Sequence, residues 1–257
     1  MTTPANVSVS IDAGVMVLTM DRPEKKNALT HAMYAGLDAA LRAAEDDPAV
    51  RVVMITGAGD AFTAGNDLGD FAASPPVDRE APVFRFLEAI AGARKPLVAA
   101  VNGLAVGVGT TMLLHCDLVY AARSAVFSAP FVNLALVPEA ASSLLLPRAI
   151  GRPKAAELFL LGARLTAVEA EAAGLVGAVF DDGALRGEAM ARARALAARA
   201  PGAVRATKAL MNRGDEPVVA RMAAEAAVFA ERLRSPELAE AVRAFMEKRA
   251  PDFSRAS

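Results

Sequence analysis

The chain opens on two apolar runs, "VSVSID" and "VMVLTM", with polar residues alternating between the apolar ones and a short "AG" turn between the runs. This alternation predicts a β-hairpin. After a polar loop, Met33, Leu37 and Leu41 recur at helical spacing between Thr30 and about Glu45. Their common face predicts an amphipathic helix, with the Thr30 side chain as its N-cap.

Downstream, short apolar segments alternate with helical ones. The runs "VRVVMITG" and "KPLVAAVNG" each end in Gly and predict buried strands, with a helix at 83–92 between them. The segment "TTMLLHCDLVYA" predicts a helix that passes into a further strand. This strand–loop–helix rhythm is typical of an α/β fold with parallel strands and crossover helices.

The C-terminal segment 198–257 has a helical pattern interrupted at Pro201, Pro217 and Pro236. We therefore expect a core over residues 1–197 and a helical region over 198–257. Several apolar residues of this region need a partner surface, either on the same subunit or in an oligomer: Met222, Phe229, Leu233 and Phe245.

Composition narrows the possible functions. A net charge of −1 and a pI near 6.2 give no bulk attraction to nucleic acid or to an anionic membrane. No apolar run reaches the ~20 residues that span a bilayer, and "MTTPANVSVS" does not read as a leader, so we expect a cytoplasmic protein. One cysteine and two histidines, Cys116, His31 and His115, do not make a zinc-type ligand set, and we expect no metal.

Two segments, "VVMITGAGDAFTAGNDL" and "PLVAAVNGLAVGVGTTM", share one form: a strand, a glycine-bearing turn and a helix start. Peptide N–H groups at a helix start have no intrahelical acceptor. Two of them aimed at one point would make an oxyanion hole, the usual means of stabilising an enolate. Gly65, Gly107 and Gly109 are equally compatible with ordinary tight turns.

Four blocks, "FTAGNDL", "KPLVAAVNGLAVGVG", "CDLVYAA" and "LPRAIGRPKAAELFLLGARLTAVEAEAAGLVGAVF", occur in the order found in the crotonase (enoyl-CoA hydratase/isomerase) superfamily, which the chain resembles over almost its whole length. The resemblance implies a β/α spiral of stacked sheets with a C-terminal helical trimerisation region, and a homotrimer or a hexamer. It implies an acyl-CoA thioester substrate and no further cofactor. The oxyanion donors would be the backbone N–H groups of Asn66 and Val108.

Family members that hydrate enoyl-CoA use two glutamates, and Thr111 and Phe131 stand at those two positions here. A carboxylate does occur in "LALVPEAASS", at Glu139, before Ser142 and Ser143, either of which could start a helix. Taken locally, Glu139 is equally a solvent-facing glutamate at a helix start. The "VPE…SS" pattern, however, resembles the peroxisomal-type Δ3,Δ2-enoyl-CoA isomerases, in which a glutamate here is the lone base.

The resemblance therefore predicts an isomerase in which Glu139 moves a proton from C2 to C4. Two alternatives stay open: another hydratase or lyase activity that uses Asp67 or Asp70 as a second group, and a catalytically silent homologue that binds acyl-CoA or RNA. The residues expected to contact CoA or the acyl chain are Lys25, Ala28, Ala64, Asp67, Leu68 and Phe131.

Overall fold

The computed structural model describes residues 2–3 and 6–253. Within these residues the strands form two sheets, a longer one in the order β1-β2-β3-β4-β6-β8-β11 and a shorter one in the order β10-β9-β7-β5. The strands of the longer sheet are β1 (Thr2–Thr3), β2 (Val7–Asp12), β3 (Val15–Met20), β4 (Val52–Gly57), β6 (Leu97–Val101), β8 (Leu118–Ala122) and β11 (Ala178–Phe180). Those of the shorter sheet are β5 (Ala61–Thr63), β7 (Leu104–Val106), β9 (Val126–Ser128) and β10 (Arg164–Thr166).

The helices connect and cover these sheets. They are η1 (Pro23–Lys25), α1 (His31–Asp46), α2 (Leu68–Ala73), α3 (Pro82–Ala91), α4 (Val108–Thr111), η2 (Met112–His115), η3 (Phe131–Leu134), α5 (Ser142–Ile150), α6 (Arg152–Leu161), α7 (Ala167–Ala173), α8 (Leu185–Ala197), α9 (Pro201–Met211), α10 (Val218–Arg232) and α11 (Pro236–Met246).

The predicted hairpin and first helix are confirmed. Strands β2 and β3 pair antiparallel, and β3, β4, β6, β8 and β11 then run parallel to their neighbours. The Thr30 hydroxyl accepts a hydrogen bond from the N–H of Met33 and caps α1.

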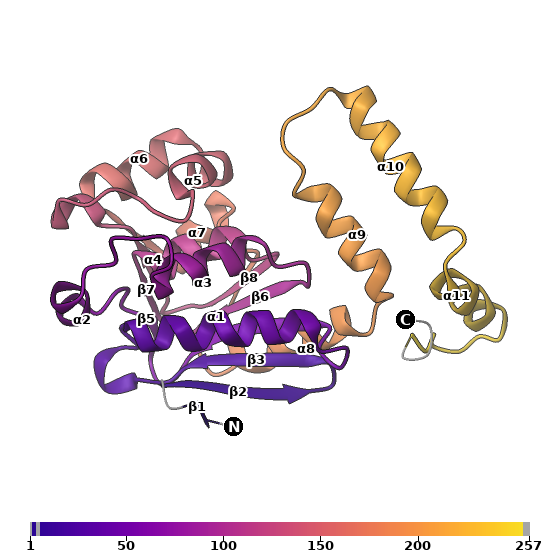
Figure 1. Cartoon of the computed structure of the whole chain (residues 1–257), viewed down its shortest axis with the longest axis horizontal. Coiled ribbons are helices and arrows are strands. Elements are labelled where there is room, and N and C mark those ends of the chain that lie inside the picture. The colour runs from indigo at the N-terminus through magenta and orange to yellow at the C-terminus, as the bar shows by residue number, and fades with distance from the viewer. Residues whose placement is uncertain (1, 4–5, 254–257) are drawn as a thin grey trace.

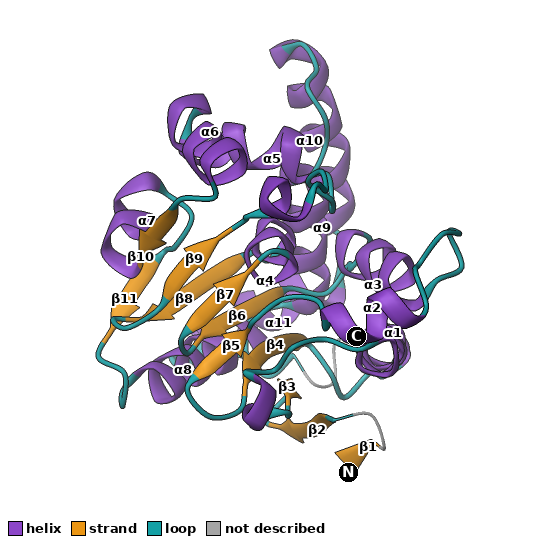
Figure 2. Ribbon diagram, turned by 90° about the vertical axis from the view of Figure 1, so that its left-hand side faces the viewer, coloured by secondary structure: helices purple, strands orange, loops and turns teal. Residues whose placement is uncertain are grey.

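The central strands β3, β4 and β6 of the longer sheet are buried on both faces, which explains their nearly continuous apolar runs. Alternate residues of β3 and β4, such as Val15 and Met54, pack against the small side chains of α8. The residues between them, such as Leu18 and Ile55, enter the main core with α1 and the shorter sheet. Figure 2 shows the shorter sheet beside the longer one, with α8 on the far side of the longer sheet.

The C-terminal helices α9, α10 and α11 stand apart from the body (Figure 1). Helix α9 is attached by Lys208, whose Nζ lies 2.7 Å from Asp117 Oδ2 and 3.0 Å from the carbonyl oxygen of Lys95. Helix α10 contains no buried residue. Its exposed large apolar side chains are Val218, Val219, Met222 and Phe229.

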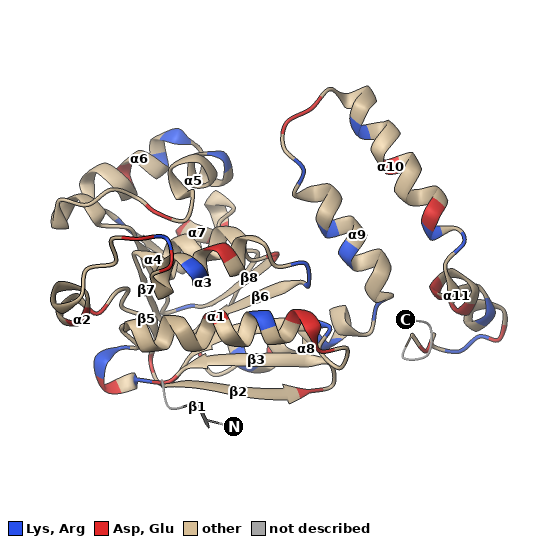
Figure 3. Cartoon of the chain, viewed as in Figure 1, with Lys and Arg blue, Asp and Glu red and all other residues tan. Residues whose placement is uncertain are grey.

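Acidic and basic residues are interspersed along the chain in Figure 3, and their numbers nearly balance. Within the described ranges no helix combines the length and the apolar character that a bilayer crossing needs.

Candidate active site

Two glycine-bearing turns lie side by side because the strands that lead into them are paired. Strands β5 and β7 run parallel, so the turns that follow them meet at one edge of the shorter sheet. A Cβ on Gly65 would lie 2.9 Å from the carbonyl oxygen of Val106, and one on Gly109 would lie 2.6 Å from Cγ2 of Thr63. Such contacts require glycine at both positions, and they bring the two turns into direct contact.

Each turn presents a backbone N–H that is a candidate oxyanion donor. Leu29 forms a bridge with residue 66 by donating its N–H to Gly65 and accepting from Asp67, 2.8 Å in both cases, which leaves the Asn66 N–H outside the bridge. Val108 is the first residue of α4, after Gly107 at φ +55° and ψ −116°, so its N–H has no intrahelical acceptor. Among the described residues neither N–H has a hydrogen-bond acceptor. The arrangement therefore fits the predicted pair of oxyanion donors.

Glu139 lies beside these turns. Its Oε1 accepts a hydrogen bond from the hydroxyl of Thr111, a fully buried residue at the end of α4. Its Oε2 is buried, and no described residue hydrogen-bonds to it. Burial raises the pKa of Glu139, and the Thr111 hydrogen bond offsets part of that rise. A carboxylate with a raised pKa and one open oxygen is suited to general-base chemistry.

The backbone around Glu139 is unusual. Ala140 and Ala141 both have φ in the left-handed region, at 55° and 53°, which costs about 1–2 kcal/mol for each alanine. The carbonyl oxygen of Ala140 accepts a 2.9 Å hydrogen bond from Nε2 of His115. Burial lowers the pKa of His115 and favours its neutral form.

Ser142, one of the two serines expected to start a helix, does begin α5, although no serine side chain caps it. The N-cap is Ala141, which makes no side-chain cap, and Ser142 is the first helical residue. Its backbone N–H and its hydroxyl both donate back to the carbonyl oxygen of Glu139, at 2.9 and 2.6 Å. The left-handed Ala140 and Ala141 turn the chain after Glu139. The two hydrogen bonds from Ser142 to the carbonyl oxygen of Glu139 stabilise that turn.

Two site residues went unnoticed in the sequence. Tyr34, fully buried on α1, donates a 2.5 Å hydrogen bond to Oδ1 of Asn66. Arg22 contacts Asp67 Oδ2 at 2.6 Å and the carbonyl oxygen of Ala28 at 3.2 Å. A tyrosine on an apolar helix face needs a partner for its hydroxyl, and that is the signal that could have singled out Tyr34.

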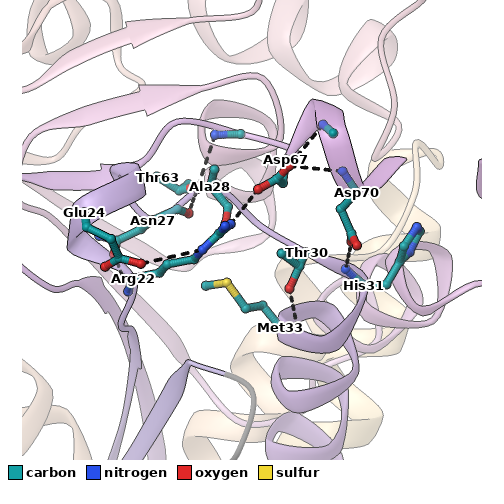
Figure 4. A network of polar contacts seen from close by, with 12 residues as sticks. Arg22, Glu24, Asn27, Ala28, Thr30, His31, Met33, Thr63, Asp67 and Asp70 are labelled. Atoms are coloured by element: carbon teal, nitrogen blue, oxygen red, sulfur yellow. Dashed lines mark hydrogen bonds and ion pairs between the residues drawn. The ribbon is translucent and has the colours of Figure 1, made fainter. Parts of the chain in front are cut away.

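Two of the six residues expected to contact CoA or the acyl chain, Ala28 and Asp67, belong to one polar network (Figure 4). Arg22 joins Ala28 to Asp67, and Asp67 Oδ1 caps α2 by accepting from the N–H groups of Gly69 and Asp70. The hydrogen bond from Arg22 is the main cause that lowers the pKa of Asp67.

The other four expected residues do not take part in these hydrogen bonds. The N–H of Ala64 donates to the carbonyl oxygen of Lys26 at 2.8 Å, and Leu68 is exposed at the start of α2. Lys25 is exposed and forms no ion pair with a described acid. Phe131 is buried near the second turn, with Cε1 4.0 Å from a Cβ built on Gly107.

Other reactive side chains of the described residues do not converge on this site. No group of three or more His, Cys, Asp or Glu side chains in that part of the chain could hold a metal ion. Burial raises the pKa of Cys116 to about 12, which leaves the thiol protonated and a poor nucleophile at neutral pH.

Comparison with known proteins agrees with this geometry. The family model for enoyl-CoA hydratase/isomerase matches residues 10–256. Enoyl-CoA delta isomerase 2 of Rattus norvegicus is 37% identical over 250 residues, covering 95% of this chain and 64% of the rat protein, so the chain spans less than two thirds of that relative. The 2,3-dehydroadipyl-CoA hydratase of Escherichia coli K12 is 35% identical, covering 95% of this chain and 97% of that protein.

Among solved structures, a Magnetospirillum magneticum AMB-1 protein that carries an enoyl-CoA hydratase/carnithine racemase name superposes with a TM-score of 0.95 at 47% identity. The match covers 98% of this chain and 100% of that one. Isomerase and hydratase names both occur among the relatives. The fold, the two glycine turns and the family match together show that the chain belongs to the crotonase family of enoyl-CoA hydratases and isomerases.

Proposed function

We propose that the chain is a Δ3,Δ2-enoyl-CoA isomerase in which Glu139 is the only proton-transferring carboxylate. The observation that carries this proposal is the pairing of Thr111 with Glu139. Thr111 and Phe131 occupy the positions at which a hydratase of this family would carry its glutamates, and Thr111 instead donates a hydrogen bond to the carboxylate of Glu139. One base is sufficient for a 1,3-proton shift, whereas water addition calls for acid and base on two reactants.

In this proposal the thioester oxygen of a 3-enoyl-CoA lies between the N–H groups of Asn66 and Val108. Glu139 Oε2 removes a proton from C2, and the negative charge moves onto the thioester oxygen to give a dienolate that the two N–H groups stabilise. The same carboxyl group then returns the proton to C4, which leaves 2-trans-enoyl-CoA. Phe131 contributes an apolar wall, which has no group that could take a proton from a water molecule.

The contacts of Asp67 and Asp70 speak against a second acid–base group. Asp67 is held by Arg22 and caps α2, and Asp70 Oδ2 accepts a 2.7 Å hydrogen bond from the N–H of His31. Both carboxylates are therefore already used in hydrogen bonds that hold the loop 22–31, which we call the CoA loop, against α2.

We also propose that the protein is a homotrimer, or a hexamer of two trimers, assembled through α9–α11, because the large apolar side chains of α10 are exposed. Catalysis with no cofactor beyond the CoA of the substrate, and a cytoplasmic location, belong to the same proposal.

The test is conversion of a 3-enoyl-CoA to the 2-enoyl-CoA by wild type and by Glu139→Gln. Removing the general base should lower kcat by roughly 10²–10⁴-fold. Hydration of 2-enoyl-CoA is measured in parallel. Hydration as fast as isomerisation would support the hydratase alternative, and an unchanged kcat in Glu139→Gln would place the base elsewhere. Tight acyl-CoA binding with no turnover in either protein would favour a silent homologue.

A further inference from the structure

Tyr34 is a core residue whose hydroxyl forms a hydrogen bond with a residue of the candidate active site. Its side chain is 0% exposed, and its ring packs against Phe86 and Phe71 at centroid distances of 5.5 and 6.1 Å. Among the described residues the hydroxyl has one hydrogen-bond partner, Oδ1 of Asn66, at 2.5 Å. The core thus makes direct polar contact with the residue that carries one of the two oxyanion N–H groups.

The bond has a defined direction. Burial, and then the charge of Glu139, raise the pKa of Tyr34 well above its ordinary value, so the phenol keeps its proton. With the proton on Tyr34 and the amide oxygen of Asn66 as acceptor, the NH₂ group of Asn66 is turned away from the core. No described residue accepts a hydrogen bond from that NH₂ group, nor from the backbone N–H of the same residue.

Two residues of the segment 29–34 therefore hold Asn66 in place. Leu29 brackets its backbone through the hydrogen bonds to residues 65 and 67, and Tyr34, on the first turn of α1, holds its side-chain oxygen. The backbone N–H and the side-chain NH₂ group of Asn66 have no acceptor among the described residues. The charge of Glu139 is the second cause, after burial, of the raised pKa of Tyr34.

We propose that Tyr34 is a positioning residue for the reaction, because its hydroxyl fixes the side chain of Asn66 and so holds the donors of Asn66 towards the thioester. This inference rests on the proposed function for its substrate. It concerns how the oxyanion hole is kept in place and not which carboxylate moves the proton.

The test uses Tyr34→Phe, which removes the hydroxyl and keeps the ring between Phe71 and Phe86. One lost hydrogen bond of this kind should lower kcat about tenfold, with KM changed less than about twofold because ground-state binding is kept. In an Asn66→Ala background the same substitution should have no further effect, since the two residues act as one unit. Tyr120→Phe is the matched control, because Tyr120 is the other tyrosine of the chain and packs against Phe180 on β11.

A second measurement separates this inference from the proposed function. Acetoacetyl-CoA has an acidic α carbon, and its bound enolate can be followed by ultraviolet absorbance without turnover. If wild type fails to isomerise but binds the enolate, the proposed isomerase is wrong, and the inference is still supported if Tyr34→Phe reduces the enolate signal and Tyr120→Phe does not. The inference is overturned if Tyr34→Phe keeps both kcat and enolate signal within twofold of wild type, if its loss is equal in the Asn66→Ala background, or if wild type binds no enolate.

Discussion

The hydroxyl of Thr111 donates a hydrogen bond to Oε1 of Glu139, although 28 residues separate the two along the chain. The bond favours the ionised carboxylate, whereas burial favours the protonated acid, and burial is the larger effect on the pKa. Thr111 therefore limits how far the pKa of Glu139 rises, and it leaves Oε2 as the carboxylate oxygen to which no described residue hydrogen-bonds.

Thr111→Val should reduce isomerisation most strongly at acidic pH. Without the hydroxyl the pKa of Glu139 rises further, so more of the enzyme carries a protonated, inactive base at a given pH. We expect a loss of about tenfold in kcat near neutral pH and a shift of the acidic limb of the kcat profile to higher pH. Thr111→Ser, which keeps the hydroxyl, should retain the wild-type profile; an identical shift in Thr111→Ser would point to packing instead.

Glu139→Gln should be more stable than wild type at neutral pH. The folded-state pKa of Glu139 is raised above its unfolded value, so ionisation disfavours the folded state and stability is lost as pH rises through that range. Removing the charge should raise Tm by a few degrees at pH 8, since about 1 kcal/mol corresponds to roughly 2–4 °C at this chain length. Thermal unfolding at pH 8 and pH 4 checks this, because the difference should shrink at the lower pH, and an equal or larger gain at pH 4 would contradict it.

Much of this architecture is readable from the sequence, but not all of it. The hairpin and α1 were predictable from their apolar periods, and β4 and β6 from continuous apolar runs that lead into a glycine-bearing turn. The shorter sheet was not, because β5, β7, β9 and β10 have three residues each, too few to show a period. The resemblance implied stacked sheets without assigning these strands.

The site divides in the same way. Glu139 and the two glycine turns stand out as local motifs, whereas their partners are distant in sequence. Tyr34 was not singled out because it shares the apolar face of α1, and Arg22 because it lies in an exposed-looking loop. Which polar group meets which is decided by the pairing of β5 with β7 and of Leu29 with Asn66, and these contacts exist only in the folded chain.

Arg22→Ala should weaken substrate binding and leave the chemical step largely intact. Arg22 joins Asp67 to Ala28, and loss of a hydrogen bond to a charged group should loosen the CoA loop and raise KM for the acyl-CoA about tenfold. Steady-state kinetics check the split between KM and kcat. Arg123→Ala, which breaks an exposed ion pair with Asp181, is the control and should change neither. A fall in kcat alone for Arg22→Ala would count against a role in binding.

Gly109→Ala should distort the second turn, and a change in Thr63 should rescue it. The new Cβ would lie 2.6 Å from Cγ2 of Thr63, and overpacking of this kind typically costs about 1–3 kcal/mol. Thr63→Ser removes that methyl group but keeps the hydroxyl that donates to Asn27 and accepts from Gly65. The double variant should regain most of the Tm and kcat lost by Gly109→Ala, and additive losses would show that the clash lies elsewhere.

The parallel pairing of β3 with β4, β4 with β6 and β6 with β8 has a kinetic consequence. Each pair closes a long stretch of chain before it gains a contact, which makes such topologies slow to form. Asn66 lies in the connection from β4 to β6, and Val108 in that from β6 to β8. Glu139 lies in the connection from β8 to β11, which also run parallel. The proposed catalytic group is therefore assembled only when the last of these connections has closed. During refolding from denaturant, helical circular dichroism should therefore recover before isomerase activity. A destabilised core should lose function before it loses its helices.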